Sequence, residues 1–169
     1  LSLVGSEMCI RDRSNIVRDI RTLYEPRWTR RGKWNQSYYE ARVPRVPTML
    51  LELLSHQNFA DMRYGIDPRF RFTVSRAIYK GMLQFLCSQY HMDYVVQPLP
   101  VDHMALRMIG ENEIELTWQA VTDSLEPTAT AEKYIVYTRI GNGDFDNGIV
   151  VDKNSYRTAL PAGVVCSYK

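Results

Sequence analysis

The sequence predicts two dissimilar parts, an α/β part followed by an all-β sandwich. Apolar residues recur at helical spacing in the first part, an uninterrupted apolar run follows, and period-two alternation dominates after residue 99. Residues 14–91 hold 13 basic and 6 acidic residues, whereas residues 92–169 hold 6 and 11. Because such a charge break is typical of two units with different surfaces, we expect domains at residues 14–91 and 99–169, joined by a linker at 92–98.

Composition excludes several classes of protein. The 169 residues are 45% hydrophobic and 24% charged, which is the balance of a folded domain. No apolar run approaches the ~20 residues that a membrane-spanning helix needs. The three cysteines include no Cys-x-x-Cys pair, which argues against a disulfide framework and a zinc ribbon.

We expect the first residues to have a different origin from the rest. Residues 3–12 (LVGSEMCIRD) resemble one reading frame of a sequencing adapter, a string that contaminates metagenomic gene predictions. A secretory signal is the alternative, but the basic start and the continuous apolar stretch of a signal are missing. We therefore expect residues 1–13 to be an adapter-like artefact of a metagenomic fragment, with the natural start and any signal peptide outside it.

The next elements are a helix and a loop. Ser14 can cap a helix over residues 14–24, whose apolar residues recur every three or four positions, and Pro26 ends it. Residues 28–45 are basic and aromatic without a clean period, so we expect a surface loop there.

A buried strand and a second helix follow. The continuous apolar run of residues 47–53 favours a strand that is covered on both faces, as in an α/β sheet. Residues 54–69 contain Gly65 and an Asp-Pro pair, which predicts a loop. Residues 72–90 place their apolar side chains on one side, which predicts a long helix packed on the core.

Short strands are predicted beyond the linker. Glycine-rich turn signals at residues 141–144 and 146–148 separate segments of alternating or β-branched residues. Their spacing favours a β-sandwich. The expected strands are residues 113–118, 134–137, 149–151, 156–160 and 164–168.

The C-terminal half resembles a fibronectin type III domain. The resemblance lies in Leu-Thr-Trp at 116–118, Tyr-Ile-Val-Tyr at 134–137 and Leu-Pro-Ala-Gly at 160–163. It implies that Trp118 is a core residue packed between two sheets. It also implies that Lys169 lies inside the sixth strand, so we expect the domain to be incomplete. Such domains act as spacers or as weak binding modules, and the fold alone does not decide between these roles.

The N-terminal half resembles the C-terminal part of a zinc-dependent N-acetylmuramoyl-L-alanine amidase. The resemblance lies in Val-Pro-Thr-Met-Leu-Leu-Glu-Leu at 46–53 and Ser-Arg-Ala-Ile-Tyr-Lys-Gly at 75–81. Residues 54–62 (LSHQNFADM) resemble a Bacteroidetes-type branch whose members are sometimes labelled xanthan lyase. The resemblance implies an α/β fold and assigns Glu52 the role of catalytic general base and acid. An ordinary carboxylate at a strand end is the alternative for Glu52.

The resemblance also implies zinc, but not in this fragment. The family binds Zn²⁺ through two histidines and a glutamate, which we expect upstream of this chain. The histidines here are His56, His91 and His103, and none belongs to a His-Glu-x-x-His or His-x-His pattern. We therefore expect Zn²⁺ in the full-length protein, no metal ligands and no cofactor in this fragment, and no activity of the fragment itself.

Candidate substrate-binding residues flank Glu52. His56 follows it by four residues, and Arg42 and Arg45 precede it in a basic, aromatic segment. Guanidinium groups suit the carboxylates of peptidoglycan stems, and aromatic rings can stack on sugars. A solvated basic loop and a polar surface histidine are the alternatives that the sequence leaves open.

These observations predict a fragment of a bacterial cell-wall hydrolase. It would cleave the N-acetylmuramoyl-L-alanine amide bond of peptidoglycan by zinc-activated water, and it would be secreted or held in the cell envelope. Peptidoglycan or another cell-surface glycan is the expected partner, without nucleic acid or a membrane span. The alternatives are a non-catalytic surface adhesion protein with a fibronectin type III spacer, and a polysaccharide lyase-type enzyme.

Overall fold

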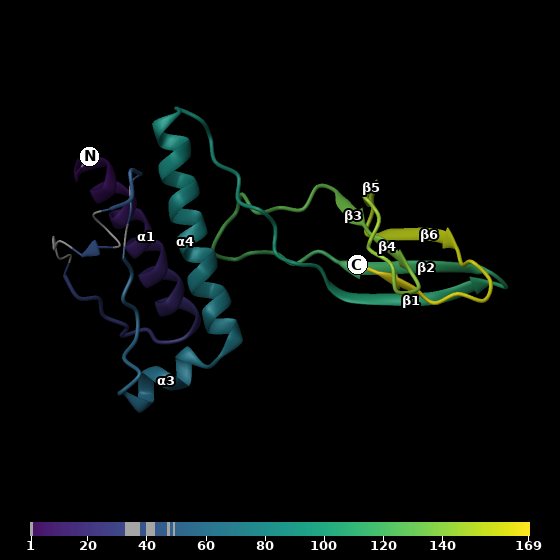
Figure 1. Ribbon diagram of the computed structural model, residues 1–169, viewed down its shortest axis with the longest axis horizontal. Helices are drawn as coiled ribbons and strands as arrows, with labels where there is room; N and C mark the ends of the chain where they lie inside the picture. The colour runs from purple at the N-terminus through teal and green to yellow at the C-terminus, as the bar shows by residue number, and fades with distance from the viewer. Residues whose placement is uncertain (1, 33–37, 40–42, 47, 49) are drawn as a thin grey trace. The chain divides into compact units, whose positions relative to one another are not determined.

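The chain forms a helical unit and a unit of antiparallel sheets (Figure 1). The computed structural model describes residues 2–32, 38–39, 43–46, 48 and 50–169, with side chains in the first helix at residue 11 and from residue 13 on. Unit 1 is Leu1–Tyr94 and unit 2 is Val95–Lys169. The boundary between the units falls inside the segment that the sequence predicts as a linker.

The helices of unit 1 are α1 (Ser2–Leu23), α3 (Phe59–Gly65) and α4 (Pro68–Gln89). The predicted helix at 14–24 is the second half of α1, which also includes the residues expected to be an adapter artefact. The loop predicted at 54–69 is wrong in part, because it contains α3. The Asn58 side chain starts α3 by accepting a hydrogen bond from the Ala60 amide at 2.9 Å, a cap that favours a helix.

The predicted helix at 72–90 is confirmed, but it begins four residues earlier. Asp67 caps α4 by accepting a hydrogen bond from the Arg69 amide at 2.9 Å. Pro68 then occupies the first turn, where its missing N–H group costs nothing. The Asp-Pro pair is therefore a helix start and not a simple turn.

The prediction of a strand at 47–53 is wrong for the residues that the structure describes. Of its residues the structure describes 48 and 50–53, and none of these is in a strand. A strand needs a neighbouring strand for its backbone hydrogen bonds, and the described part of unit 1 has none. The run is apolar for another reason, because Leu51, Leu53 and Leu54 pack against the helical core.

The core of unit 1 lies between two antiparallel helices. Ile16 and Ile20 of α1 pack with Phe70, Val74 and Ala77 of α4, and all five are at most 7% exposed. Aromatic rings close one end of this core, and neighbouring rings within it lie 5.2 to 6.3 Å apart at tilted or edge-on angles that suit aromatic pairs. The aromatic residues are Tyr24, Trp28, Tyr64 and Phe70.

Unit 2 contains one three-stranded sheet and two two-stranded sheets, all antiparallel. The orders are β1-β2-β6, β3-β5 and β4-β7. Every predicted strand region contains a strand, although the strand predicted at 134–137 ends at Val136, one residue before a further short strand begins at Thr138. The strands are β1 (Asp102–Gly110), β2 (Glu113–Gln119), β3 (Tyr134–Val136), β4 (Thr138–Ile140), β5 (Ile149–Val151), β6 (Ser155–Ala159) and β7 (Cys166–Tyr168).

The core of unit 2 joins residues from all three sheets. Leu116 and Trp118 of β2 and Val136 of β3 are at most 5% exposed, and side chains of β5, β6 and β7 pack against them. The expected burial of Trp118 is confirmed, and its ring lies edge-on to Tyr134 with centroids 5.3 Å apart. The chain enters β5 through Gly148, where a Cβ atom would lie 2.4 Å from Ile135 Cγ2, so only glycine fits.

Candidate functional site

Glu52 lies on an irregular segment between α1 and α3 of unit 1. Its neighbours Leu51 and Leu53 are partly buried against the helical core, whereas Glu52 is exposed. The segment is tied to α3 where the Ser55 amide donates to Asp61 Oδ2 at 3.0 Å. The anchored leucines therefore direct the Glu52 side chain to solvent, and the strand end that was predicted to carry it is absent from the described residues.

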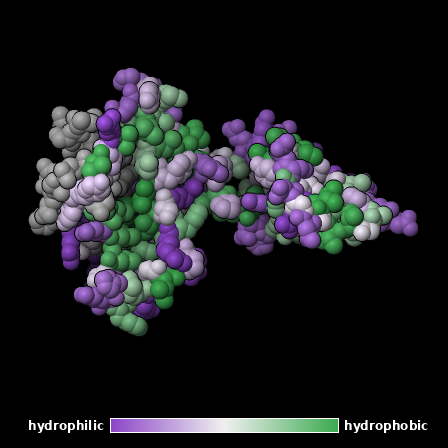
Figure 2. Space-filling model, viewed as in Figure 1, coloured by the Kyte–Doolittle hydropathy of each residue, from purple (hydrophilic) through white to green (hydrophobic). Residues whose placement is uncertain are grey.

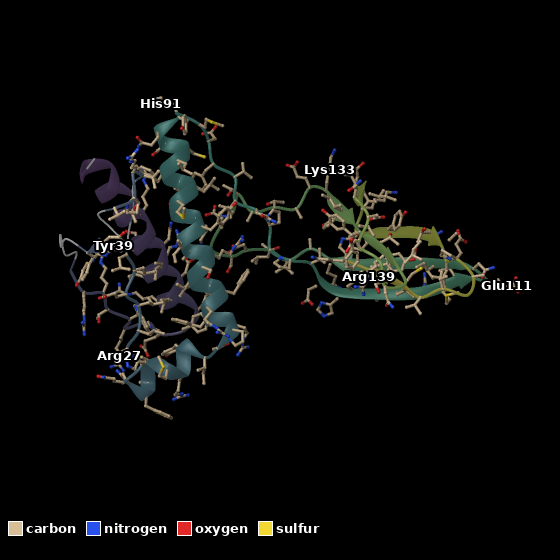
Figure 3. All side chains as sticks on the ribbon, viewed as in Figure 1. Arg27, Tyr39, His91, Glu111, Lys133 and Arg139 are labelled. Atoms are coloured by element: carbon tan, nitrogen blue, oxygen red, sulfur yellow. The ribbon has the colours of Figure 1, made fainter. Side chains whose placement is uncertain are left out.

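The predicted substrate-binding residues are not gathered around Glu52. His56 is exposed in the turn before α3, and Arg45 is exposed further upstream. Arg42 lies outside the described residues. In the part of the chain that the structure describes, no hydrogen bond or ion pair joins Glu52, His56 and Arg45. Figure 3 labels Arg27 and Tyr39, which mark the course of the connection between α1 and α3.

The described residues do not fit the zinc site that the resemblance implies. They contain no group of three or more His, Cys, Asp or Glu side chains that could hold a metal ion. His91 and His103 are exposed, and His103 Nδ1 lies 3.3 Å from Asp102 Oδ2 in unit 2. Since a catalytic zinc ion is held by three converging protein ligands, no catalytic step through zinc can be derived for this chain.

A hollow in unit 1 gathers basic side chains instead. Its volume is about 580 Å³, and it is open to solvent. Three arginines line it together with two hydroxyl residues and one apolar residue, and among the described lining residues there is neither Glu52 nor any other carboxylate. The lining residues are Ser14, Val17, Arg18, Arg21, Thr22 and Arg30. We call this feature the arginine hollow.

Sequence reasoning missed a buried ion pair beside the arginine hollow. Lys80 Nζ of α4 donates to Asp19 Oδ2 of α1 at 2.6 Å, and the two side chains are 1% and 3% exposed. Arg18 Nε contacts the other oxygen, Asp19 Oδ1, at 3.0 Å. The available signal was helical spacing, because Asp19 lies three residues after Ile16 and Lys80 lies three residues after Ala77, each on the apolar face of its helix.

A second charged group lies on the three-stranded sheet of unit 2. Glu115 of β2 is directly opposite Arg107 of β1 and Arg157 of β6, and its oxygens accept from them at 2.5 and 2.8 Å. Hydrogen bonds from Arg157 and Arg107 hold the pKa of the Glu115 carboxyl below its usual value, although desolvation opposes them. Glu111, labelled in Figure 3, lies in the turn between β1 and β2.

Exposed apolar residues are common in both units. Met104, Leu106 and Met108 of β1 are 46 to 52% exposed, and Figure 2 shows hydrophobic residues at the surface of each unit. Among the described residues, none of the helices combines the length and the apolar character that crossing a bilayer requires.

Comparisons with known proteins leave the family open. No protein-family model matches the sequence, and no curated protein is similar enough to it to be matched.

Proposed function

We propose that the chain is part of a bacterial cell-wall hydrolase of the N-acetylmuramoyl-L-alanine amidase type, with Glu52 as its general base and acid. The sequence resemblance at residues 46–62 and 75–81 supports the proposal. The observation that carries it is the presentation of Glu52, since Leu51 and Leu53 are anchored on the core and the carboxylate between them is exposed. A carboxylate held in this way is free to meet a substrate from solution.

The chemistry assigned to Glu52 is proton transfer. Water attacks the carbonyl carbon of the amide, the carboxylate takes the proton of that water, and the C–N bond breaks as the same proton passes to the amine of L-alanine. The second unit would act as a spacer of fibronectin type III kind, secreted or displayed at the envelope together with the hydrolase. Peptidoglycan is the proposed substrate.

Digestion of peptidoglycan tests the role of Glu52. The longest polypeptide that contains this chain is incubated with purified sacculi, and free amino termini of L-alanine are counted. Glu52→Gln should reduce their release by two or more orders of magnitude, because loss of a general base costs about 10²–10⁴ in rate. Glu111→Gln, a matched exposed glutamate in unit 2, should leave the rate unchanged. An active Glu52→Gln variant would refute the proposal.

Metal analysis gives a second test on the chain as it stands. We expect the purified 169-residue chain to bind no stoichiometric zinc after equilibration, because the described residues provide no converging ligands. One tightly held Zn²⁺ per chain would contradict the expectation that the ligands lie elsewhere.

A non-catalytic binding protein is the second candidate. It is favoured by one observation, which is that Glu52 does not line the arginine hollow. If sacculi bind the longer polypeptide but are not cleaved, and Glu52→Gln leaves that binding unchanged, this candidate replaces the hydrolase.

A further inference from the structure

We propose that the arginine hollow of unit 1 is a binding site for a small oxyanion that carries two or more negative charges. Arg18, Arg21 and Arg30 line the hollow, and none of the other described residues that line it carries a carboxylate. Three guanidinium groups around one space repel each other, and an anionic ligand would offset that repulsion. This inference stands apart from the proposed hydrolase, because Glu52 is not part of the hollow.

The arrangement depends on a segment that folds back onto α1. Arg21 Nε donates to the Trp28 carbonyl at 2.7 Å. Trp28 is in turn packed in the aromatic end of the core, with its ring centroid 5.9 Å from that of Tyr64. These contacts hold the segment that carries Arg30 beside the helix.

Two of the arginines are also oriented by their own hydrogen bonds. Arg18 Nε donates a hydrogen bond to Asp19 Oδ1 at 3.0 Å, and Arg21 Nε donates one to the Trp28 carbonyl. The Asp19 charge is already shared with the buried Lys80, so it does not neutralise Arg18 in full. A guanidinium fixed at Nε still has its terminal nitrogens for a ligand, and a fixed donor loses less entropy when the ligand binds.

The chemistry of the lining selects the class of ligand. Guanidinium groups bind carboxylates and phosphates through pairs of hydrogen bonds, and three of them line the hollow. The described lining residues include no aromatic side chain on which a base or a sugar ring could stack. The hollow is open to solvent, and three arginines along its lining suit a molecule with two or more anionic groups.

Calorimetric titration of the full chain tests this site. Sodium pyrophosphate and sodium citrate are titrated separately at low ionic strength, and the stronger binder identifies phosphate or carboxylate as the preferred group. We expect saturable one-to-one binding of at least one probe, weakened by added salt. Arg30→Gln should weaken it about tenfold, because one charge-assisted hydrogen-bonding group is lost. Arg71→Gln, an exposed arginine of α4 outside the hollow, should leave it unchanged.

The variants separate a built site from a general charge effect. Arg30 makes no hydrogen bond to another described residue, so Arg30→Gln should unfold at the same temperature as the parent chain. Arg21→Lys keeps the positive charge but loses the paired N–H donors of the guanidinium, so this variant should bind the anionic probe less tightly than the parent chain does. Absence of binding by both probes at millimolar concentration, or equal weakening by Arg30→Gln and Arg71→Gln, would overturn the proposal.

Discussion

The two units both bury charge, but they do it in different ways. In unit 1 Asp19 and Lys80 are 3% and 1% exposed and lie between two helices. In unit 2 the guanidinium side chains of Arg107 and Arg157 are 72% and 66% exposed, and only Glu115, at 11%, is covered. The first pair has lost nearly all contact with water, whereas the second group keeps its positive charges solvated.

This difference determines what each group contributes to folding. A fully buried pair is costly to desolvate, and removal of one partner leaves an uncompensated charge in the core. A group with solvated arginines has little to lose, because water replaces a missing partner. We therefore expect unit 1 to depend strongly on its ion pair and unit 2 to depend mainly on apolar packing.

Removal of the buried amine should give the largest effect. Lys80→Met leaves the Asp19 carboxylate buried with only Arg18 beside it, and we expect the free energy of unfolding of unit 1 to fall by ~3 to 5 kcal/mol. Urea denaturation followed by far-ultraviolet circular dichroism measures the loss. Lys153→Met, at an exposed lysine of unit 2, is the matched control.

A double variant checks the reason for that loss. Asp19→Leu with Lys80→Met removes both charges, and it should recover most of the stability because an apolar pair can replace a buried ion pair. If the double variant is as unstable as Lys80→Met alone, lost packing and not the orphaned charge explains the effect.

Truncation of an apolar residue should dominate in unit 2. Leu116 is 0% exposed and touches the core shared by the sheets, so Leu116→Ala should lower the free energy of unfolding by about 3 kcal/mol. Leu106, its partner across the strands, is 52% exposed, and Leu106→Ala should have a much smaller effect. Equal losses would mean that the exposed side of β1 is covered in solution.

Neutralisation of Glu115 should have a modest effect that depends on pH. Its pKa is lowered in the folded state from the ordinary value of 4.5, so its contribution is present above that value and disappears as the pH falls through the folded pKa. Glu115→Gln should therefore reduce the melting temperature slightly at neutral pH and flatten its decline below pH 4.5. Glu113→Gln, the exposed glutamate on the same strand, should leave the pH profile unchanged. An unchanged profile for Glu115→Gln would show that the arginines contribute nothing to folding.

The periodicity of apolar residues was sufficient to predict helices and strands whose pattern lies within one stretch of sequence. The one-sided apolar face of α4 and the alternation in β2 were sufficient to place both elements. The apolar run at 47–53 was misleading, because a core-facing irregular segment and a buried strand need the same leucines. β1 was overlooked although Met104, Leu106 and Met108 alternate with other residues along it.

The candidate sites were harder to predict, because they depend on distant contacts. Asp19 and Lys80 are 61 positions apart and meet only once α1 and α4 pack. Arg18 and Arg21 look like ordinary solvated helix residues until the chain brings Arg30 back beside them. Glu52 was singled out by resemblance alone, and its exposure could not be inferred from a run that reads as buried throughout.

The smallest expected effect concerns the start of α4, and it separates a hydrogen bond from a charge. The hydrogen bond that the Arg69 amide donates to Asp67 lowers the pKa of this carboxyl. The contribution of the ionised carboxyl to stability is therefore lost as the pH falls below the ordinary value of 3.8. Asp67→Asn keeps an acceptor for the amide and should change the melting temperature at neutral pH very little, whereas Asp67→Ala should lower it measurably. Thermal unfolding followed by circular dichroism distinguishes the two variants. Equal losses for both would show that the charge itself, acting on the helix dipole and on Arg69 Nε 3.5 Å away, and not the amide hydrogen bond, stabilises this helix start.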